Sequence, residues 1–309
     1  MWHILKKLLS NYTNKLMTRQ KIIIDCDPGI DDMLAIRYAL RSPKLEVVGF
    51  SVVSGNVADY KGVNNLKEIL YQENRLDLPI HIGRGRPLNK FFRDAEDTHG
   101  QYGLGYFSDY HQLDKAVAPE SASEFLLAHA DCTILALGPL TNIADSYLLN
   151  PTLAQSFKII SMGGNLYEQG NMSEFSEYNY WVDPESAKLA LNHLDVTMVG
   201  LDVTRKLKFY PEDVVDETDL EILRFYFEFH QKYENFYGAV INDPLVVDYL
   251  LYPQDYTSQK VKLDVLTEEG EYRGQTIVSQ DNDYRLNQAL VAVSDINKIK
   301  ARIKKQVLN

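Results

Sequence analysis

The sequence predicts a single α/β domain with a mostly parallel, Rossmann-like central sheet flanked by helices, and an antiparallel hairpin near the C-terminus. Three observations support this fold class. Short β-branched runs alternate with segments of helical periodicity, a pattern typical of βαβ units. Hydrophobic residues make up 45% and charged residues 24% of the 309 residues, as in packed globular proteins. No repeat, linker or low-complexity tract divides the chain.

The first half of the predicted sheet follows this alternation. The β-branched run at residues 21–24 predicts a buried parallel strand, and residues 31–40 have helical spacing with an acidic first turn. A second strand is expected at 45–53, a helix at about 60–72 and a short strand at 79–83. These segments make the first βαβ units of the fold.

The second half repeats the pattern and then departs from it. Strands are expected at 133–137, 158–162 and 196–200, with a helix beginning at about Thr141. Residues 261–278 differ, because two alternating runs flank the polar sequence Glu-Glu-Gly-Glu. Such a pattern predicts an antiparallel hairpin.

Composition and chain ends limit the possible classes of protein. Residues 1–16 are expected to form a disordered or amphipathic extension, which leaves one domain at 17–309. The net charge of −11, from 32 basic and 43 acidic residues, argues against general binding of nucleic acid or anionic membranes. No apolar run approaches the roughly 20 residues that span a bilayer. The two cysteines, Cys26 and Cys132, make no disulfide framework, which favours a reducing, cytoplasmic compartment.

Four aspartates follow the first predicted strand within eight positions: Asp25, Asp27, Asp31 and Asp32. Carboxylates this close repel one another unless something neutralises them. Helix capping explains Asp31 and Asp32 in the first helical turn, but not the pair at the strand end. A bound cation explains all four, and all-oxygen donors favour Ca²⁺ or Mg²⁺ over zinc.

Rival carboxylate motifs fit less well. An EF-hand loop starting at Asp25 needs a glutamate at its twelfth position, which is Ile36, and a helix before it, where a strand is predicted. Aspartyl-phosphate phosphatases also carry Asp-x-Asp after a first strand, but not followed by Pro-Gly-x-Asp-Asp. Neither a P-loop nor a Gly-x-Gly-x-x-Gly motif occurs.

Five motifs occur in a fixed order over about residues 20–295. They are Asp25–Asp32, Ser54–Val57, Leu135–Asn142, the segment from Met162 through Glu185, and Asn242–Pro244. The first is similar to the D-x-D-P-G-x-D-D signature of the inosine-uridine preferring nucleoside hydrolases, and the others resemble further motifs of that family. The resemblance implies a Ca²⁺-dependent enzyme that hydrolyses the N-glycosidic bond of ribonucleosides to free base and ribose.

The resemblance also implies roles for single residues. Asp27, Asp32, Asp243 and the backbone carbonyl of Leu137 would bind Ca²⁺, and Asp27 would be the general base that takes a proton from water. The residues implied in ribose binding are Asp31, Asn56, Met162, Asn171, Glu177, Asn179 and Asp243. The partner would be a small ribonucleoside, and the assembly a homodimer or homotetramer.

One residue departs from the family pattern. Many members carry a histidine at the position of Asn242, proposed to protonate the departing base, and asparagine cannot act as an acid. Leaving-group or base-pocket residues are therefore sought at His99, which begins a glycine-rich loop resembling the family's flap, and at His230, Tyr233 and Tyr237. The last three fall on a predicted aromatic helix at residues 220–237.

Two other functions stay open at this stage. Asn242 motivates a ribose- or nucleoside-binding protein that keeps the cation site but catalyses weakly. The phosphatase is the third hypothesis, for which release of phosphate from small phosphomonoesters would be the mark.

Overall fold

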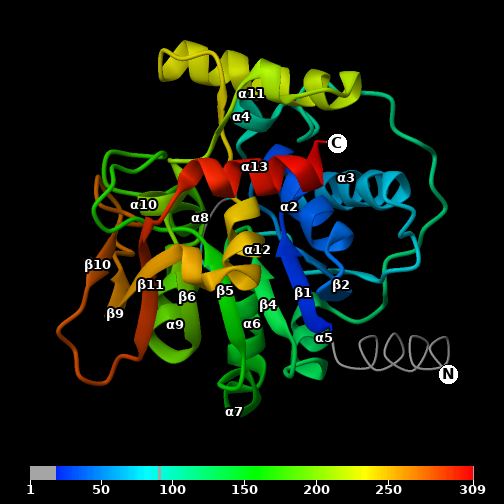
Figure 1. Cartoon of the computed structure of the whole chain (residues 1–309). Coiled ribbons are helices and arrows are strands. Elements are labelled where there is room, and N and C mark those ends of the chain that lie inside the picture. The colour runs from blue at the N-terminus through cyan, green and yellow to red at the C-terminus, as the bar shows by residue number, and fades with distance from the viewer. Residues whose placement is uncertain (1–18, 90–91, 309) are drawn as a thin grey trace, which may run out of the picture.

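Figure 1 shows the computed structural model of the chain, which describes residues 19–89 and 92–308. The extension predicted at 1–16 lies outside the described residues. A nine-stranded sheet runs through the centre in the order β10-β9-β11-β6-β5-β4-β1-β2-β3. In chain order its strands are β1 Gln20–Cys26, β2 Leu45–Val52, β3 Ile80–Ile82, β4 Thr133–Ala136, β5 Lys158–Met162, β6 Asp195–Val199, β9 Tyr256–Val265, β10 Thr276–Val278 and β11 Leu286–Val293.

The sheet is parallel from β11 to β3, and only β9 and β10 add antiparallel pairing. The fold class predicted from the sequence is confirmed. The hairpin predicted at 261–278 is confirmed as well, since Val265 of β9 faces Thr276 of β10. β11 returns beside β6 and was not predicted, because its sequence follows a polar turn rather than a clear helical segment.

Helices cover both faces of this sheet. Ile22 and Ile24 belong to one apolar cluster and Ile23 to the other, as expected for a strand whose side chains alternate between two buried faces. The first face is covered by α2 Ile30–Arg41, α3 Asp59–Gln72, α12 Pro244–Leu251 and α13 Ile296–Val307. The second is covered by α5 Ala122–Ala128, α6 Thr141–Leu149, α7 Pro151–Ala154 and α9 Pro184–His193.

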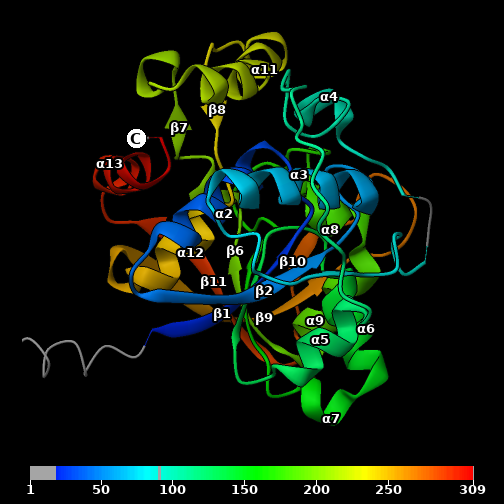
Figure 2. The same ribbon diagram turned by 90° about the vertical axis from the view of Figure 1, so that its right-hand side faces the viewer.

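The remaining elements gather near the carboxyl ends of the parallel strands. They are α4 Glu96–His99, α8 Tyr178–Val182, α10 Leu201–Thr204, α11 Glu217–Tyr233, two 3₁₀ turns at Pro211–Asp213 and Pro253–Asp255, and the small antiparallel pair β7 Lys208–Phe209 and β8 Ala239–Val240. Figure 2 shows α11 and α4 together above the main body of the molecule. α11 is therefore attached to the domain through its contacts with neighbouring elements rather than through the sheet.

The aromatic helix predicted at 220–237 is wrong at its C-terminal end. α11 begins after Asp216, whose side chain accepts hydrogen bonds from the first backbone amides, and it ends at Tyr233. Asn235 has a positive φ of 59°, a conformation that a helix cannot contain, so the chain turns there. Tyr237 consequently lies beyond the helix.

None of the helices in the described part of the chain has both the length and the apolar character needed to cross a bilayer.

Candidate functional site

A cavity of about 620 Å³ opens at the carboxyl ends of the parallel strands and is lined by residues of α11. This is the position at which open α/β sheets bind ligands. Most of the predicted site residues line it: Asp31, Asn56, His99, Leu137, Met162, Asn171, Glu177, Asn179, His230, Tyr233, Asn242 and Asp243. Asp27 and Asp32 are fully buried and are not among the lining residues, and neither is Tyr237.

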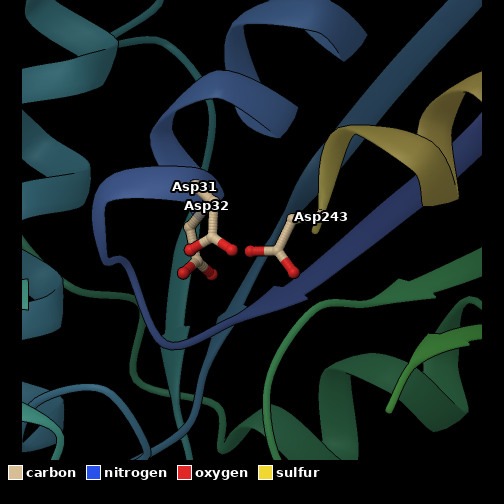
Figure 3. A group of neighbouring side chains, drawn as sticks. All are labelled: Asp31, Asp32 and Asp243. Atoms are coloured by element: carbon tan, nitrogen blue, oxygen red, sulfur yellow. The ribbon is translucent and has the colours of Figure 1, made fainter. Parts of the chain in front are cut away.

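Three carboxylates from opposite ends of the chain meet at this cavity. Asp31 and Asp32 lie in the first turn of α2, and Asp243 immediately precedes Pro244 at the start of α12. One carboxylate oxygen from each of the three residues lies within 4.8 Å of the others. Figure 3 shows the three side chains close together, with the carboxylate of Asp243 facing those of Asp31 and Asp32. Asp31 was predicted to bind ribose, whereas the structure groups it with two predicted metal ligands.

Asp27 is tied to the same cluster through hydrogen bonds. Its Oδ2 accepts the amide N–H of Asn56 at 2.6 Å, and its own amide donates to Asp32 Oδ1 at 3.2 Å. Its Oδ1 is buried and has no hydrogen-bond partner among the described residues. Glycine is required on both sides, because a Cβ at Gly55 or Gly138 would overlap the Asp27 carboxylate.

Burial of these carboxyl groups shifts their titration strongly. Desolvation, followed by the neighbouring charge of Asp31, raises the pKa of Asp32 to about 7. Desolvation together with neighbouring aspartates raises the pKa of Asp27 and Asp243 well above the usual range. No arginine, lysine or histidine is bonded to these three carboxylates in the described structure.

The donor set fits a hard divalent cation. All side-chain donors are carboxylate oxygens, and the orphaned Oδ1 of Asp27 lacks the partner that a buried oxygen requires. The backbone carbonyl of Leu137, a residue that lines the cavity, accepts a hydrogen bond from Asn179 Nδ2 at 2.7 Å. The metal roles of Asp27, Asp32, Asp243 and Leu137 remain predictions.

The polar wall at 162–179 is held by its own hydrogen bonds. Glu177 caps α8 and accepts backbone N–H groups of Gly164, Asn179 and Tyr180 at 2.8 to 3.1 Å. Its burial raises the pKa of the carboxyl to about 7 despite these bonds. Asn179 Nδ2 reaches the carbonyls of Leu137 and Met162. These bonds fix the positions of Glu177 and Asn179 at the cavity wall.

Asn56 and Asn171 also serve this framework. The Nδ2 of Asn56 donates to Asp32 Oδ2 at 2.9 Å, and the Oδ1 of Asn171 accepts the amide of Tyr178 at the same distance. Both residues line the cavity. Their predicted contacts with ribose stay predictions, while their support of the carboxylates and of α8 is seen directly.

A chain of hydrogen bonds joins the opposite wall to Asp31. The amide of Ile30 donates to His99 Nδ1 at 3.1 Å, so the ring proton lies on Nε2, which donates to Tyr226 Oη at 3.0 Å. Tyr226 Oη donates in turn to Asp31 Oδ1 at 3.1 Å. Burial lowers the pKa of His99 to about 4, which keeps this ring neutral at physiological pH.

The other candidates for leaving-group chemistry are placed differently. His230 uses both ring nitrogens within the protein, on the carbonyl of Tyr226 and the amide of Val240. The Nδ2 of Asn242 donates to Asp31 Oδ2 at 3.3 Å, which supports Asp31 but offers no acid. Tyr233 lines the outer part of the cavity and is 57% exposed.

The predicted flap is a packed turn in the structure. His99 is 4% exposed, and the glycines after it have positive φ: Gly100, Gly103 and Gly105. A Cβ at Gly105 would overlap the carbonyl of Ile222 in α11. Close packing therefore explains why this loop is rich in glycine.

Two aromatic residues of α11 that line the cavity were not predicted from the sequence. Tyr226 and Phe229 line the cavity together with His230 and Tyr233, and these four positions follow the i, i+3, i+4, i+7 spacing of one helix face. That spacing was the signal that could have found them.

The comparisons with known proteins agree with this geometry. The family model "Inosine-uridine preferring nucleoside hydrolase" matches residues 22–302. The chain is 31% identical over 285 residues to a "Probable uridine nucleosidase 1" of Oryza sativa subsp. japonica, with 87% of each chain covered. It is 33% identical to the inosine-uridine preferring nucleoside hydrolase of Leishmania major, over 84% of this chain and 87% of that one.

Solved structures give the same result. A plant nucleoside hydrolase superposes with a TM-score of 0.88 at 27% identity, covering 94% of this chain and 99% of the other. A purine-preferring ribonucleoside hydrolase from Gardnerella vaginalis superposes with a TM-score of 0.87 at 27% identity, covering 93% and 98%. The order of motifs, the carboxylate cluster and these matches lead to one conclusion: the chain belongs to the inosine-uridine preferring nucleoside hydrolase family of enzymes.

Proposed function

We propose that this enzyme hydrolyses the N-glycosidic bond of ribonucleosides to free base and ribose with the help of Ca²⁺. The observation that carries the proposal is the convergence of Asp31, Asp32 and Asp243 on a polar cavity, with the unpartnered Oδ1 of Asp27 behind them. Asp27, Asp32, Asp243 and the Leu137 carbonyl would hold the cation. When bound, Ca²⁺ supplies a positive charge that lowers the pKa of water and favours binding of a vicinal diol.

The chain's own residues account for the remaining steps. Asp27 Oδ1 takes the proton of the attacking water, because Oδ2 is already occupied by the amide of Asn56. Cleavage builds positive charge on the ribose ring, as in other glycosyl hydrolyses, and the surrounding carboxylates favour that charge. Asn171, Glu177 and Asn179 provide oriented polar groups for the sugar hydroxyls.

The departing base would lie against the wall formed by α11 and α4. Aromatic side chains of Tyr226, Phe229 and Tyr233 line that wall and offer faces for stacking. Of the predicted leaving-group residues, His99 is joined to the carboxylate cluster, through Tyr226. We place hydrogen bonding to the departing base on the Tyr226 hydroxyl, which would turn its single proton from Asp31 to the base while His99 Nε2 continues to donate to that hydroxyl.

The proposal is tested with p-nitrophenyl riboside and a panel of common ribonucleosides. Asp27→Ala is expected to lose about 10³-fold in kcat while keeping its unfolding midpoint in EDTA, since a general base contributes roughly 10²- to 10⁴-fold. Complete removal of metal with EDTA is expected to abolish turnover, and added Ca²⁺ to restore it. Equal turnover after metal removal would exclude the role of the cation.

Asn242 favours a second candidate, a ribose- or nucleoside-binding member with weak catalysis. Calorimetric binding of ribose without release of base from any nucleoside would support it. We also expect a cytoplasmic homodimer or homotetramer, from the resemblance to the family and from the cysteine content.

A further inference from the structure

Two side-chain hydrogen bonds join α11 to α2, and only one of them lies at the cavity. At the cavity, Tyr226 Oη of α11 donates to Asp31 Oδ1 of α2 at 3.1 Å. Away from it, Arg37 Nη1 of α2 donates to Asp219 Oδ1 of α11 at 2.5 Å. Neither Arg37 nor Asp219 lines the cavity. The helix that carries the cavity residues is therefore also held to α2 by an ion pair outside the cavity, which we call the remote pair.

The spacing of the two contacts fixes the register of the helices. Asp31 and Arg37 are about 9 Å apart along α2, and Tyr226 and Asp219 are about 10.5 Å apart along α11, at 1.5 Å rise per residue. The order of the partners reverses, so the helices run antiparallel between the contacts. A shift of one turn at the remote contact would move Tyr226 by a similar distance from Asp31.

The remote pair of Arg37 and Asp219 is buried and is held in place by a further hydrogen bond. The side chains of Arg37 and Asp219 are 6% and 8% exposed. Arg37 Nη2 also donates to Gln72 Oε1 of α3 at 2.8 Å, so its guanidinium is oriented from a third helix. Between described residues, this is the only ion pair that joins α11 to the rest of the chain, because Arg224–Glu228 lies within the helix.

We propose that Arg37 and Asp219 are positioning residues that set the base-binding face of α11 against the carboxylates of α2. The inference rests on the proposed placement of the base along α11. It assigns selectivity for the nucleobase partly to a pair of residues that never touches the substrate. Hydrolysis of a substrate with an activated leaving group needs this placement less, because its leaving group departs without hydrogen bonds to the enzyme.

The test compares a ribonucleoside from the panel with p-nitrophenyl riboside in Asp219→Asn. We expect kcat/KM for the nucleoside to fall about tenfold, mainly through kcat, and kcat/KM for p-nitrophenyl riboside to change less than about twofold. The Ca²⁺ affinity is expected to stay unchanged. The double variant Arg37→Met/Asp219→Leu replaces the ion pair by an apolar contact and should remain folded. Because it lacks the directional hydrogen bond between the two side chains, it should show the same loss of selectivity.

A matched control separates positioning from stability. Asp264→Asn removes the Lys188–Asp264 ion pair between α9 and β9 and should lower the unfolding midpoint without changing selectivity. Equal effects on both substrates, or no effect on either, would overturn the inference. If the wild-type protein hydrolyses neither substrate, the proposed function fails instead, so the two failures are distinguishable.

Discussion

At the scale of single residues, the hydroxyl of Tyr226 is the group that connects the aromatic wall to the carboxylates. It accepts from His99 and donates to Asp31, so one oxygen links three segments of the chain. Because Asn242 cannot act as an acid, we assign the hydrogen bond to the base to this hydroxyl, which lines the cavity and would turn from Asp31 to the base.

Tyr226→Phe removes that hydroxyl and keeps the ring. We expect kcat for a ribonucleoside to fall about 10²-fold, the lower range for general acid catalysis, while hydrolysis of p-nitrophenyl riboside changes little. Steady-state kinetics on both substrates measure this difference. His230→Gln is the control, because both ring nitrogens of His230 are hydrogen-bonded to backbone groups. Its replacement should therefore not affect the two substrates differently. A uniform loss on both substrates with Tyr226→Phe would contradict the role.

His99 carries a pH dependence of stability with a defined sign. Its pKa is lowered from 6.5 to about 4 in the folded protein, so the unfolded chain binds the proton more tightly. The contribution of the neutral ring is fully present above pH 6.5 and is lost as the pH falls toward 4, up to about 3 kcal/mol in total. Urea unfolding of wild type and His99→Gln, both in EDTA, should show a stability difference that shrinks between pH 7 and pH 5. Parallel profiles would contradict this.

At the scale of elements, the sequence predicted the strands and the polar residues that follow them. It did not predict the contacts between elements that are distant in the chain. The β-branched run at 21–24 predicts a buried strand, and the aspartates directly after it predict a site at the end of that strand. Both features can be recognised from neighbouring residues in the sequence. The support of Asp31 by Tyr226 and Asn242 depends on how α11 and α12 pack against α2. No local pattern encodes such packing, and the missed role of Tyr226 follows from that.

The C-terminal helix α13 anchors the element that carries Asp243. Arg302 Nη2 donates to Asp248 Oδ2 of α12 at 2.6 Å, and Nη1 to Asp255 at 2.9 Å. Asp248 is completely buried, and it keeps the hydroxyls of Tyr38 and Tyr256 as its other donors. Its charge therefore depends on Arg302 for compensation.

Arg302→Met is expected to lower the free energy of unfolding by about 3 kcal/mol, because it leaves a buried carboxylate without its cation. Urea denaturation followed by far-UV circular dichroism measures the loss. Arg302→Lys keeps the charge and should lose clearly less. A loss below about 1 kcal/mol for Arg302→Met, the range of exposed pairs, would show that the contact contributes no more than a surface salt bridge.

At the scale of the whole molecule, the fold concentrates negative charge where the parallel strands end. Segments near residues 27, 56, 137, 179 and 243 are remote in sequence, and the sheet order brings their strand ends or loops to one cavity. The chain has a net charge of −11. Repulsion between the carboxylates of this cluster therefore adds to the repulsion that the excess of acidic residues already causes. A cation binding there would relieve repulsion between elements from both ends of the chain.

Calcium is therefore expected to stabilise the entire domain, and more strongly at pH 8 than at pH 5.5. In the absence of metal, burial raises the pKa of Asp32 to about 7 and holds the pKa of Asp27 and of Asp243 well above the usual range, so at pH 5.5 the folded protein holds protons that Ca²⁺ must displace. At a hundredfold excess over Kd, a ligand that binds only the folded state adds about 2.7 kcal/mol. Thermal unfolding with Ca²⁺ or EDTA at both pH values measures the shift. Asp243→Asn should lose most of it, and an equal shift at the two pH values would contradict the proton competition on which the expectation depends.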